Sequence, residues 1–446
     1  MNYTLSIGIA TVFCLLLPLA DRFWPDKTGV PVKPGVPDKA GSSNKAGSLA
    51  DPAARKGATN SKLLELLVLL FSAALIFLFN NHRFVIYNNY SYLAQSLLQG
   101  RLDVPQIPDY LESVSYNGTT YMHFAPGPSI LLLPLIAIFG MGFNIGILAN
   151  LLGAFNILLF YRILIKLGFD DLKGRLWLTA LFGFGTVHFF LSVVGHSWFL
   201  GHVSATFFIL LALLLTVGKA KRGKDRWCIF LLAGLAYGMA VTCRMPLLLS
   251  GLLFLGLILL GKKAGWKGVL LFAAGAAVPG GLYMLYNYLR FDTILDLSYV
   301  LTFAKDRPEM TGGPLQLQFV PYNLYSMFIL SPEFTQGFPW LKPSLAGVSL
   351  TFTSPALFAA VMARGEKWMV GLLWQTAGLT ALPFLLNYGN GMAQFGMRYA
   401  MDFIPFLMIL AAMGWKKMGM YRKGLISLCI WLNIWGVLYW NAYYLA

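Results

Sequence analysis

The side chains best suited to chemistry lie in a polar stretch, residues 81–128, which separates two strongly apolar runs. This stretch carries three carboxylates, Asp103, Asp109 and Glu112, and His123 lies near its end. A carboxylate at a wet membrane surface can deprotonate an acceptor hydroxyl as a general base, or help to hold a divalent cation. Any one of these acids could equally be an ordinary solvated loop residue. The sequence therefore predicts that a reaction centre, where one exists, includes this stretch.

Arginines that could bind phosphate lie at the ends of later apolar runs. Residues 388–399 lead into Arg398, Tyr399 and Asp402, and Arg244 stands at the mouth of another run. A guanidinium group binds phosphate oxygens bidentately, although an arginine here could also be an interfacial cation reaching toward water. Arg398 and Asp402 are one helical turn apart, so on an α-helix they could share a face or pair. We predict all four side chains to bind substrate.

A third polar region, residues 290–344, mixes acids, bases and many aromatic residues. Arg307 is its candidate phosphate ligand. The aromatic residues could stack on sugar faces, although Trp and Tyr concentrate at the interface of any membrane protein. His188, His196 and His202 are close enough in sequence to suggest zinc, but no carboxylate or cysteine joins them, which favours polar residues lining a wet cavity. No metal site is predicted from these histidines.

Composition fixes the class of protein. Of the 446 residues, 57% are hydrophobic and only 12% are charged, whereas soluble domains carry about 25% charged residues. Apolar runs near the ~20 residues that a spanning helix needs recur along the chain. The formal charge of +16 is that of a membrane protein whose basic loops stay on the cytoplasmic side and face anionic lipid, so we expect no nucleic-acid partner. The expected fold is all-α and polytopic.

The chain divides into three parts. Residues 1–24 form an N-terminal hydrophobic segment, and residues 25–62 a linker rich in Lys, Pro, Gly and Ser that we expect to be disordered and cytoplasmic. Residues 63–446 form the membrane domain. Its predicted spans are 63–80, 129–165, 176–194, 198–217, 227–243, 247–261, 269–289, 345–363, 368–387, 400–415 and 424–445.

The run 129–165 is too long for one straight helix. Gly140-Met141-Gly142 interrupts it, so we count it as one net crossing, made by a half-buried or re-entrant helix and a full one. With the linker inside, every inner loop is then basic, while the loops 81–128, 290–344 and 388–399 face outward and hold most of the loop carboxylates. The positive-inside rule thus favours about 11 crossings, or 12 if the N-terminal segment spans, with an outer C-terminus and short extracytoplasmic helices.

Several short motifs resemble those of the GT-C superfamily of membrane glycosyltransferases. The chain looks most like bacterial relatives of the protein O-mannosyltransferase and aminoarabinose transferase group. The similarity covers most of residues 63–446 as a pattern of spans. The motifs are YSYLA at 90–94, LLQGRLD at 97–103, YNG at 116–118, PGP at 126–128, LLLP at 131–134 and FGMRY at 395–399, the last one preceding a span that contains Pro405.

This resemblance implies an enzyme that takes a sugar from a polyprenyl-phosphate carrier at the outer face of the membrane. The acceptor would be a hydroxyl of a glycan, lipid or protein of the cell envelope, and the location a bacterial plasma membrane. The family's acidic pair, however, falls on Ile86-Tyr87 here, and no carboxylate follows before Asp103. We therefore expect Asp103 or Asp109 as the catalytic base, with Arg398, Tyr399, Asp402, Arg244, His123 and Arg307 binding substrate.

Two other classes of protein remain open. A transporter or flippase for a lipid-linked sugar would carry ionisable residues near the bilayer midplane, whereas the charges here collect at span ends. A non-catalytic envelope protein that keeps the GT-C fold is compatible with the missing acidic pair. The sequence leaves the cofactor unknown, with a divalent cation at the outer carboxylates as one candidate.

Overall fold

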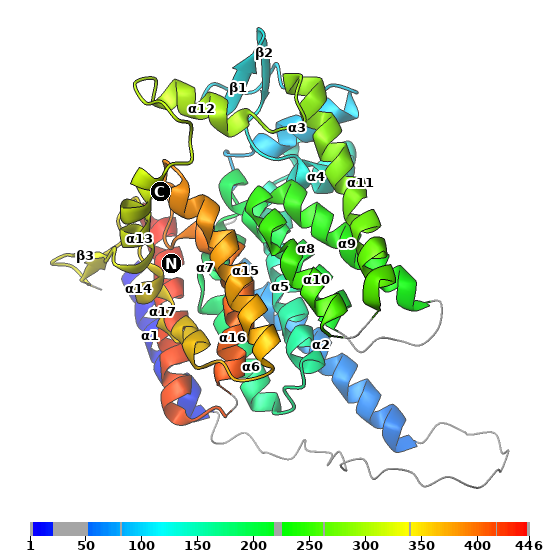
Figure 1. Ribbon diagram of the computed structural model, residues 1–446. Coiled ribbons are helices and arrows are strands. Elements are labelled where there is room, and N and C mark those ends of the chain that lie inside the picture. Colours follow the sequence, from blue (N-terminus) through cyan, green and yellow to red (C-terminus); the bar gives the residue numbers. More distant parts are fainter. Residues whose placement is uncertain are drawn as a thin grey trace, which may run out of the picture.

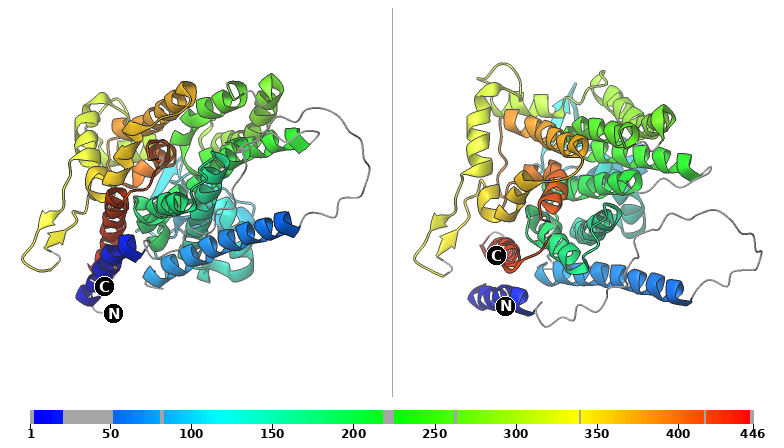
Figure 2. Two further views of the ribbon diagram at one scale, coloured as in Figure 1. Left: turned by 90° about the horizontal axis from the view of Figure 1, so that it is seen from below. Right: turned by 60° about the horizontal axis from the view of Figure 1, so that its bottom comes forward.

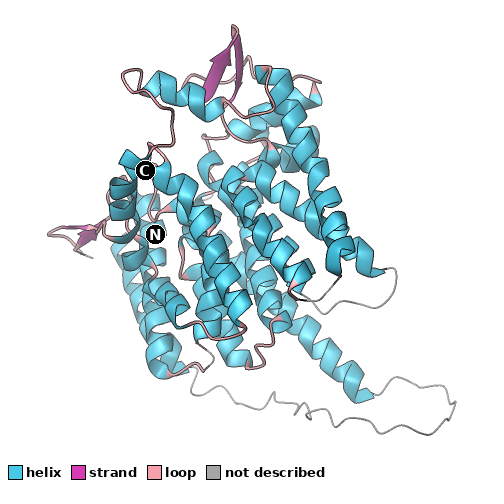
Figure 3. Ribbon diagram, in the orientation of Figure 1, coloured by secondary structure: helices cyan, strands magenta, loops and turns pink. Residues whose placement is uncertain are grey.

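The computed structural model describes residues 3–20, 52–80, 83–217, 225–261, 264–338, 340–415 and 417–443. Within these residues the chain is a bundle of helices with two short hairpins (Figures 1 and 3). Six helices are long and apolar enough to cross a membrane, or seven if one bent pair counts as a span. The predicted class, a helical polytopic membrane protein, is confirmed.

The long helices account for most of the bundle. They are α1 (Tyr3–Ala20), α2 (Pro52–Phe79), α5 (Ile145–Lys166), α8 (Ser197–Val217), α9 (Asp225–Cys243), α11 (Gly265–Phe291), α15 (Lys367–Leu386) and α17 (Met420–Tyr443). Shorter apolar helices complete it: α4 (Gly127–Phe139), α6 (Leu172–Phe184), α7 (Val187–Val194), α10 (Gly251–Leu259), α14 (Leu350–Thr353) and α16 (Ile404–Gly414). Five apolar helices have only 10–17 residues. The predicted 11 or 12 crossings need some of these shorter helices to span as well, but not α4, which belongs to the predicted re-entrant segment.

The polar loops fold into short elements at one end of the bundle (Figure 1). They are α3 (Asn89–Leu98), the hairpin β1 (Ser113–Tyr116) and β2 (Thr119–Met122), and α12 (Ser298–Asp306), whereas α13 (Val320–Phe328) lies lower, on the left flank near the second hairpin. β1 and β2 are antiparallel, with Tyr116 opposite Thr119. Asn117 and Gly118 both have positive φ, 49° and 77°, as a two-residue hairpin turn requires. A second hairpin, β3 (Glu333–Phe334) and β4 (Leu341–Lys342), projects at the left edge.

Two predicted spans differ from the structure. Residues 176–194 form α6 and α7, bent by 55° at a break, because Thr186 accepts the His188 N–H and caps a new helix. Residues 345–363 contain only α14 and the 3-10 helix η5 (Pro355–Met362), since Pro355 has no amide hydrogen to continue a helix. The predicted break after α4 is confirmed: Gly140 has a φ of 65°, and η2 (Gly140–Gly142) separates α4 from α5.

Helix α2 also begins earlier than predicted. It starts at Pro52, a residue well suited to the first helical turn, and so includes residues 52–62 that the sequence analysis assigns to the linker. Its apolar part, Ser61–Phe79, matches the predicted span. The predicted disorder of the remaining linker lies outside the described residues. Helix α1 packs along α17, where the Trp431 indole donates to the Thr11 hydroxyl at 2.7 Å (Figure 2).

The pair α9 and α11 shows how small residues hold the bundle together. A Cβ on Gly234 of α9 would lie 1.9 Å from the Phe272 carbonyl oxygen, and one on Gly275 of α11 would lie 2.1 Å from the Leu231 carbonyl oxygen. The two backbones therefore touch directly, as small residues permit at helix contacts in membranes. This contact places the C-terminal end of α9, and with it Arg244, at the end of the bundle that carries the polar elements.

Candidate functional site

An arginine–aspartate–histidine cluster lies where α8, α9 and the short 3-10 helix η6 (Arg398–Asp402) meet. Arg244, which directly follows α9, makes a bidentate pair with Asp402: Nε to Oδ1 is 3.1 Å and Nη2 to Oδ2 is 2.7 Å. His202 of α8 approaches the same carboxylate, with Nδ1 3.4 Å from Oδ1. The Asp402 side chain is 2% exposed. A carboxylate so deeply buried needs a partner cation, and Arg244 supplies it.

Asp402 pairs with Arg244 rather than with Arg398, the partner suggested by the spacing in the sequence. The reason is the conformation of residues 398–402, which form a 3-10 helix. With three residues per turn, positions i and i+4 of a 3-10 helix do not lie above one another as they do on an α-helix. The guanidinium group of Arg398 consequently points elsewhere.

Arg398 is a buried cation without a carboxylate. It is 8% exposed, and its Nη1 donates to the Met392 carbonyl oxygen at 3.0 Å and to Gln394 Oε1 at 3.3 Å. Among the described residues no carboxylate lies within ion-pair distance of it, and its Nε and Nη2 donate no hydrogen bond. Gly391 leaves room for this group, because a Cβ there would lie 2.7 Å from Nη1.

Tyr399 stands between the two arginines. Its ring centroid is 5.4 Å from Arg244 Cζ and 5.0 Å from Arg398 Cζ, within the range of cation–π attraction. The ring also stacks on Phe384 of α15, at 5.0 Å between centroids. The predicted set Arg244, Arg398, Tyr399 and Asp402 is thus brought together in space.

Helix α12 extends over this cluster. Tyr299 is close enough to both arginines and to Tyr399 to interact with them electrostatically. One turn on, the Thr302 hydroxyl lies 2.9 Å from His123 Nδ1. His123 also contacts the Tyr299 ring, at 4.8 Å between centroids, and its burial lowers the pKa of the imidazole to about 4. His123 therefore borders the cluster through Tyr299, as a neutral imidazole at pH 7.

Glu112 is the acid of the first polar loop that the charge of Arg398 influences. The Trp198 indole donates to both of its carboxylate oxygens, at 2.8 and 2.9 Å, and the Asn89 amide holds its backbone carbonyl at 3.0 Å. Surrounding protein raises the pKa of Glu112 above its usual range, while the indole and the charge of Arg398 oppose the rise. The side chain is still more than a third exposed, so solvent reaches it.

The other two loop acids form no hydrogen bond or ion pair with Arg244 or Arg398. Asp103 forms a bidentate pair with Arg101, with Nε to Oδ1 at 3.0 Å and Nη2 to Oδ2 at 2.5 Å. The hydrogen bond from Arg101 lowers the pKa of Asp103, which makes it a weaker base. Asp109 is exposed and has no hydrogen bond or ion pair with any described residue.

Arg307 lies at the end of α12. Its amide donates to the Phe303 carbonyl oxygen at 2.8 Å, and its side chain is exposed. The structure gives that side chain no contact with the arginine cluster. In the segments that the structure describes, no group of three or more His, Cys, Asp or Glu side chains could hold a metal ion.

Sequence reasoning named Glu112 as a loop acid but did not choose it. Glu112 is distinguished from the other loop acids only by contacts with residues far away in the sequence. Tyr87, at the position of the family's missing acidic pair, contacts the Trp198 ring at 4.7 Å, and Trp198 holds Glu112. The Tyr87 carbonyl oxygen accepts from the Ser197 amide at 2.9 Å and from its hydroxyl at 2.7 Å. Tyr87 and Ser197 are 110 positions apart in the sequence, so no local sequence pattern predicts their contact.

No protein-family model matches the chain. No curated protein matches it either. Among solved structures the chain is similar to ArnT from Cupriavidus metallidurans bound to undecaprenyl phosphate, with a TM-score of 0.48 and 12% identity over 86% of this chain and 77% of that one. A similarity of this size assigns no activity and no residue role to this chain.

Proposed function

We propose that this protein is a membrane glycosyltransferase that moves a sugar from a polyprenyl-phosphate donor to an acceptor hydroxyl at the outer face of a cell membrane. The observation that carries the proposal is Arg398, a buried guanidinium with no carboxylate partner among the described residues. Glu112 is near enough for the charge of Arg398 to lower its pKa. A buried unpaired cation is costly, so its retention favours an anionic ligand that supplies the missing charge. The sequence motifs around residues 90–103 and 395–399 support the same function.

Arg398 would hold the phosphate of the donor. Its Nε and Nη2 have no hydrogen bond with described residues, and these two atoms form the edge that binds an anion bidentately. Arg244 would add positive potential, although Asp402 already holds its guanidinium in place. As the bond to the sugar breaks, negative charge grows on the phosphate, and a fixed arginine stabilises that charge.

Glu112 would be the general base. The family pattern places its acid where this chain has Tyr87, and the contacts Tyr87–Trp198 and Trp198–Glu112 bring Glu112 beside that position in space. A raised pKa makes its carboxylate a better proton acceptor than an ordinary glutamate. Glu112 therefore replaces Asp103 and Asp109 as the proposed base.

The reaction then balances as follows. The acceptor oxygen attacks the anomeric carbon of the donor sugar and forms the new glycosidic bond. The bond between that carbon and the phosphate oxygen breaks, and the polyprenyl phosphate departs with the electron pair while Arg398 holds it. The proton of the acceptor hydroxyl passes to Glu112.

The test is transfer from a radiolabelled polyprenyl-phosphate sugar by purified protein, with membranes as the source of acceptor. We expect the wild type to turn over at least one such donor. Arg398→Ala should lower the rate by about 100-fold or more, the usual loss when a group that stabilises developing charge is removed. Arg398→Lys should restore part of it, because lysine keeps the charge and loses the bidentate geometry.

Arg364→Ala is the matched control, since Arg364 is an exposed arginine in the loop before α15. It should leave the rate unchanged. If the wild type turns over no polyprenyl-linked donor, the proposal fails in favour of a flippase or a non-catalytic envelope protein. Equal rates for Arg398→Ala and Arg364→Ala would remove Arg398 from the site.

A further inference from the structure

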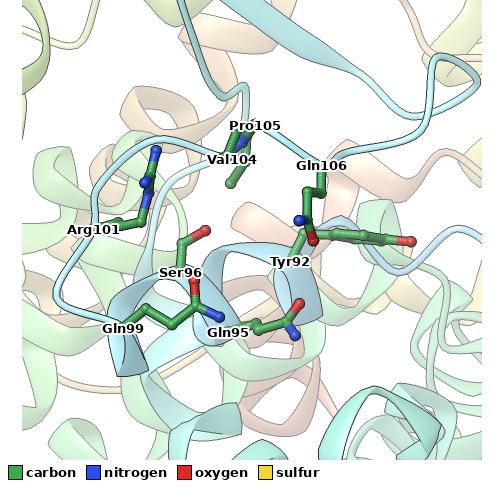
Figure 4. A pocket seen from close by; sticks show the side chains of 8 residues that line it. All are labelled: Tyr92, Gln95, Ser96, Gln99, Arg101, Val104, Pro105 and Gln106. Atoms are coloured by element: carbon green, nitrogen blue, oxygen red, sulfur yellow. The ribbon is translucent and has the colours of Figure 1, made fainter.

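A polar hollow of about 100 Å³ opens beside α3, apart from the arginine cluster (Figure 4). One wall is α3 and its C-terminal turn, and the other is the segment 101–106. This volume is below the range of about 300–1,000 Å³ typical of whole small-ligand sites, so the hollow has room for only one part of a larger ligand. The hollow is lined by Tyr92, Gln95, Ser96, Gln99, Arg101, Val104, Pro105 and Gln106.

The walls of this hollow are fixed by hydrogen bonds. The Arg101 amide donates to the Ser96 carbonyl oxygen at 2.9 Å, which ties the second wall to the end of α3. The Val104 amide donates to the Thr120 carbonyl oxygen at 2.9 Å, which ties it to β2. Ser96 and Val104, one on each wall, are buried. A cavity with fixed walls binds its ligand with less loss of conformational entropy.

The chemistry of the lining is neutral and rich in amides. Gln95, Gln99 and Gln106 bring three amide groups to the hollow, and none of these side chains has a hydrogen bond with a described residue. The charge of Arg101 is balanced by Asp103. An amide group donates and accepts at once, as a hydroxyl does, so several amides around a neutral cavity suit a ligand rich in hydroxyl groups better than an anion.

Aromatic rings lead from the hollow toward Glu112. Tyr92 of the lining lies near Tyr110, whose ring is 6.4 Å from that of Tyr87. The Tyr87 ring is 4.7 Å from that of Trp198, and Trp198 donates to Glu112. All four rings are at least partly exposed. Such rings present apolar faces with polar edges, which suits the alternating CH and OH surfaces of a sugar chain.

We propose that this hollow and the rings beside it bind neutral sugar residues of a glycan acceptor, with one terminal hydroxyl presented at Glu112. This inference rests on the proposed transferase function and narrows the acceptor to a glycan or glycolipid. The amides would bind the hydroxyl groups of a sugar some distance from the reacting one, and the rings would support the residues between.

The test is saturation-transfer difference NMR on the full-length protein in lipid nanodiscs. The probes are trisaccharides of glucose, mannose and N-acetylglucosamine, and a trisaccharide of glucuronic acid serves as the anionic comparison. We expect at least one neutral probe to receive saturation and the anionic probe to receive less. The variant Gln95→Ala/Gln99→Ala/Gln106→Ala should lose most of that signal, at least fivefold, while Gln336→Ala, an exposed glutamine near β3, should keep it.

Binding is measured without turnover, so this result is separate from the transferase test. Loss of sugar binding in the triple glutamine variant, with release of polyprenyl phosphate from the donor retained, supports an acceptor site. No saturation of any neutral probe in the wild type overturns the inference. Equal saturation in the triple variant also overturns it, and leaves these aromatic residues as an interfacial belt. If Arg398→Ala abolishes donor turnover while sugar binding persists, the two sites are distinct.

Discussion

Four arginines near the polar end of the bundle differ in how their charge is balanced. Arg101 has Asp103, Arg244 has Asp402, and the buried Arg290 has Asp296 at 3.6 Å. Arg398 alone among these four lacks a carboxylate in the described residues. Three of these arginines therefore stabilise the fold, and the fourth is suited to bind an anion. This difference could not be predicted from the sequence, because it depends on which carboxylate each guanidinium group meets in the folded protein.

The proposed base gives a pH dependence with a defined sign. Glu112 must be deprotonated to accept a proton, so the transfer rate should fall as the pH drops through its pKa, which lies above the usual range. The Trp198 indole lowers that pKa by donating to the carboxylate. Trp198→Phe should therefore raise the pKa and move the acidic limb of the rate profile to higher pH.

The measurement is the rate of transfer against pH for the wild type, Trp198→Phe and Trp266→Phe. Trp266 is 68% exposed on α11 and serves as the control. Its variant should give the wild-type profile. An acidic limb that stays in place, or moves to lower pH, in Trp198→Phe would show that Glu112 is not the group that titrates.

At the scale of elements, the sequence predicts apolar helices well and their breaks unevenly. Gly140-Met141-Gly142 marks a break that the structure contains, because glycine readily adopts the positive φ found there. The bend after Phe184 is not predicted, because residues 176–194 have the length and overall hydropathy of one span, and the break depends on Gly185 and the Thr186 cap within it. The 3-10 conformation of residues 398–402 is not predicted either, because the spacing of Arg398 and Asp402 is equally compatible with an α-helix, and this conformation decides which arginine Asp402 binds.

The contact between α9 and α11 predicts that alanine substitution of two glycines in α11 changes the stability of the protein by different amounts. Gly275→Ala should destabilise the protein by about 1–3 kcal/mol, the usual cost of overpacking, because its Cβ would lie 2.1 Å from the Leu231 carbonyl oxygen. Gly280→Ala has nothing within 4 Å of its Cβ and should be neutral or slightly stabilising. Thermal unfolding in detergent distinguishes them, and equal Tm values would contradict the close approach of these helices.

At the scale of the molecule, the polar elements and the proposed site share one end of the bundle. Helices α3 and α12 and the β1–β2 hairpin lie there, while α15 begins at the other end (Figure 1). Composition and charge could predict this separation, because apolar length and the basic bias of loops are visible in the sequence. The pairing of side chains across loops 81–128, 290–344 and 388–399 could not be predicted, since it depends on how the helices pack.

We predict that the loop at residues 81–128 and the loop before α15 lie on opposite sides of the membrane. In a Cys228→Ser background, single cysteines at Asp109 and at Arg364, both exposed positions, should react with a membrane-impermeant maleimide from opposite sides of sealed vesicles. The position at 109 should be extracytoplasmic, because the loop at 364 is basic and stays inside. Labelling of both from the same side would place the proposed site and the basic loops in one compartment and contradict the topology.

The central claim is that Glu112, rather than Asp103, activates the acceptor opposite a phosphate held by Arg398. The most direct measurement is the rate of sugar transfer from a radiolabelled polyprenyl-phosphate donor by the wild type, Glu112→Gln and Asp103→Asn. A general base contributes about 100- to 10,000-fold, so Glu112→Gln should lose at least 100-fold, while Asp103→Asn should stay within a few-fold of the wild type. Full activity in Glu112→Gln, or its loss in a well-folded Asp103→Asn, would contradict this account.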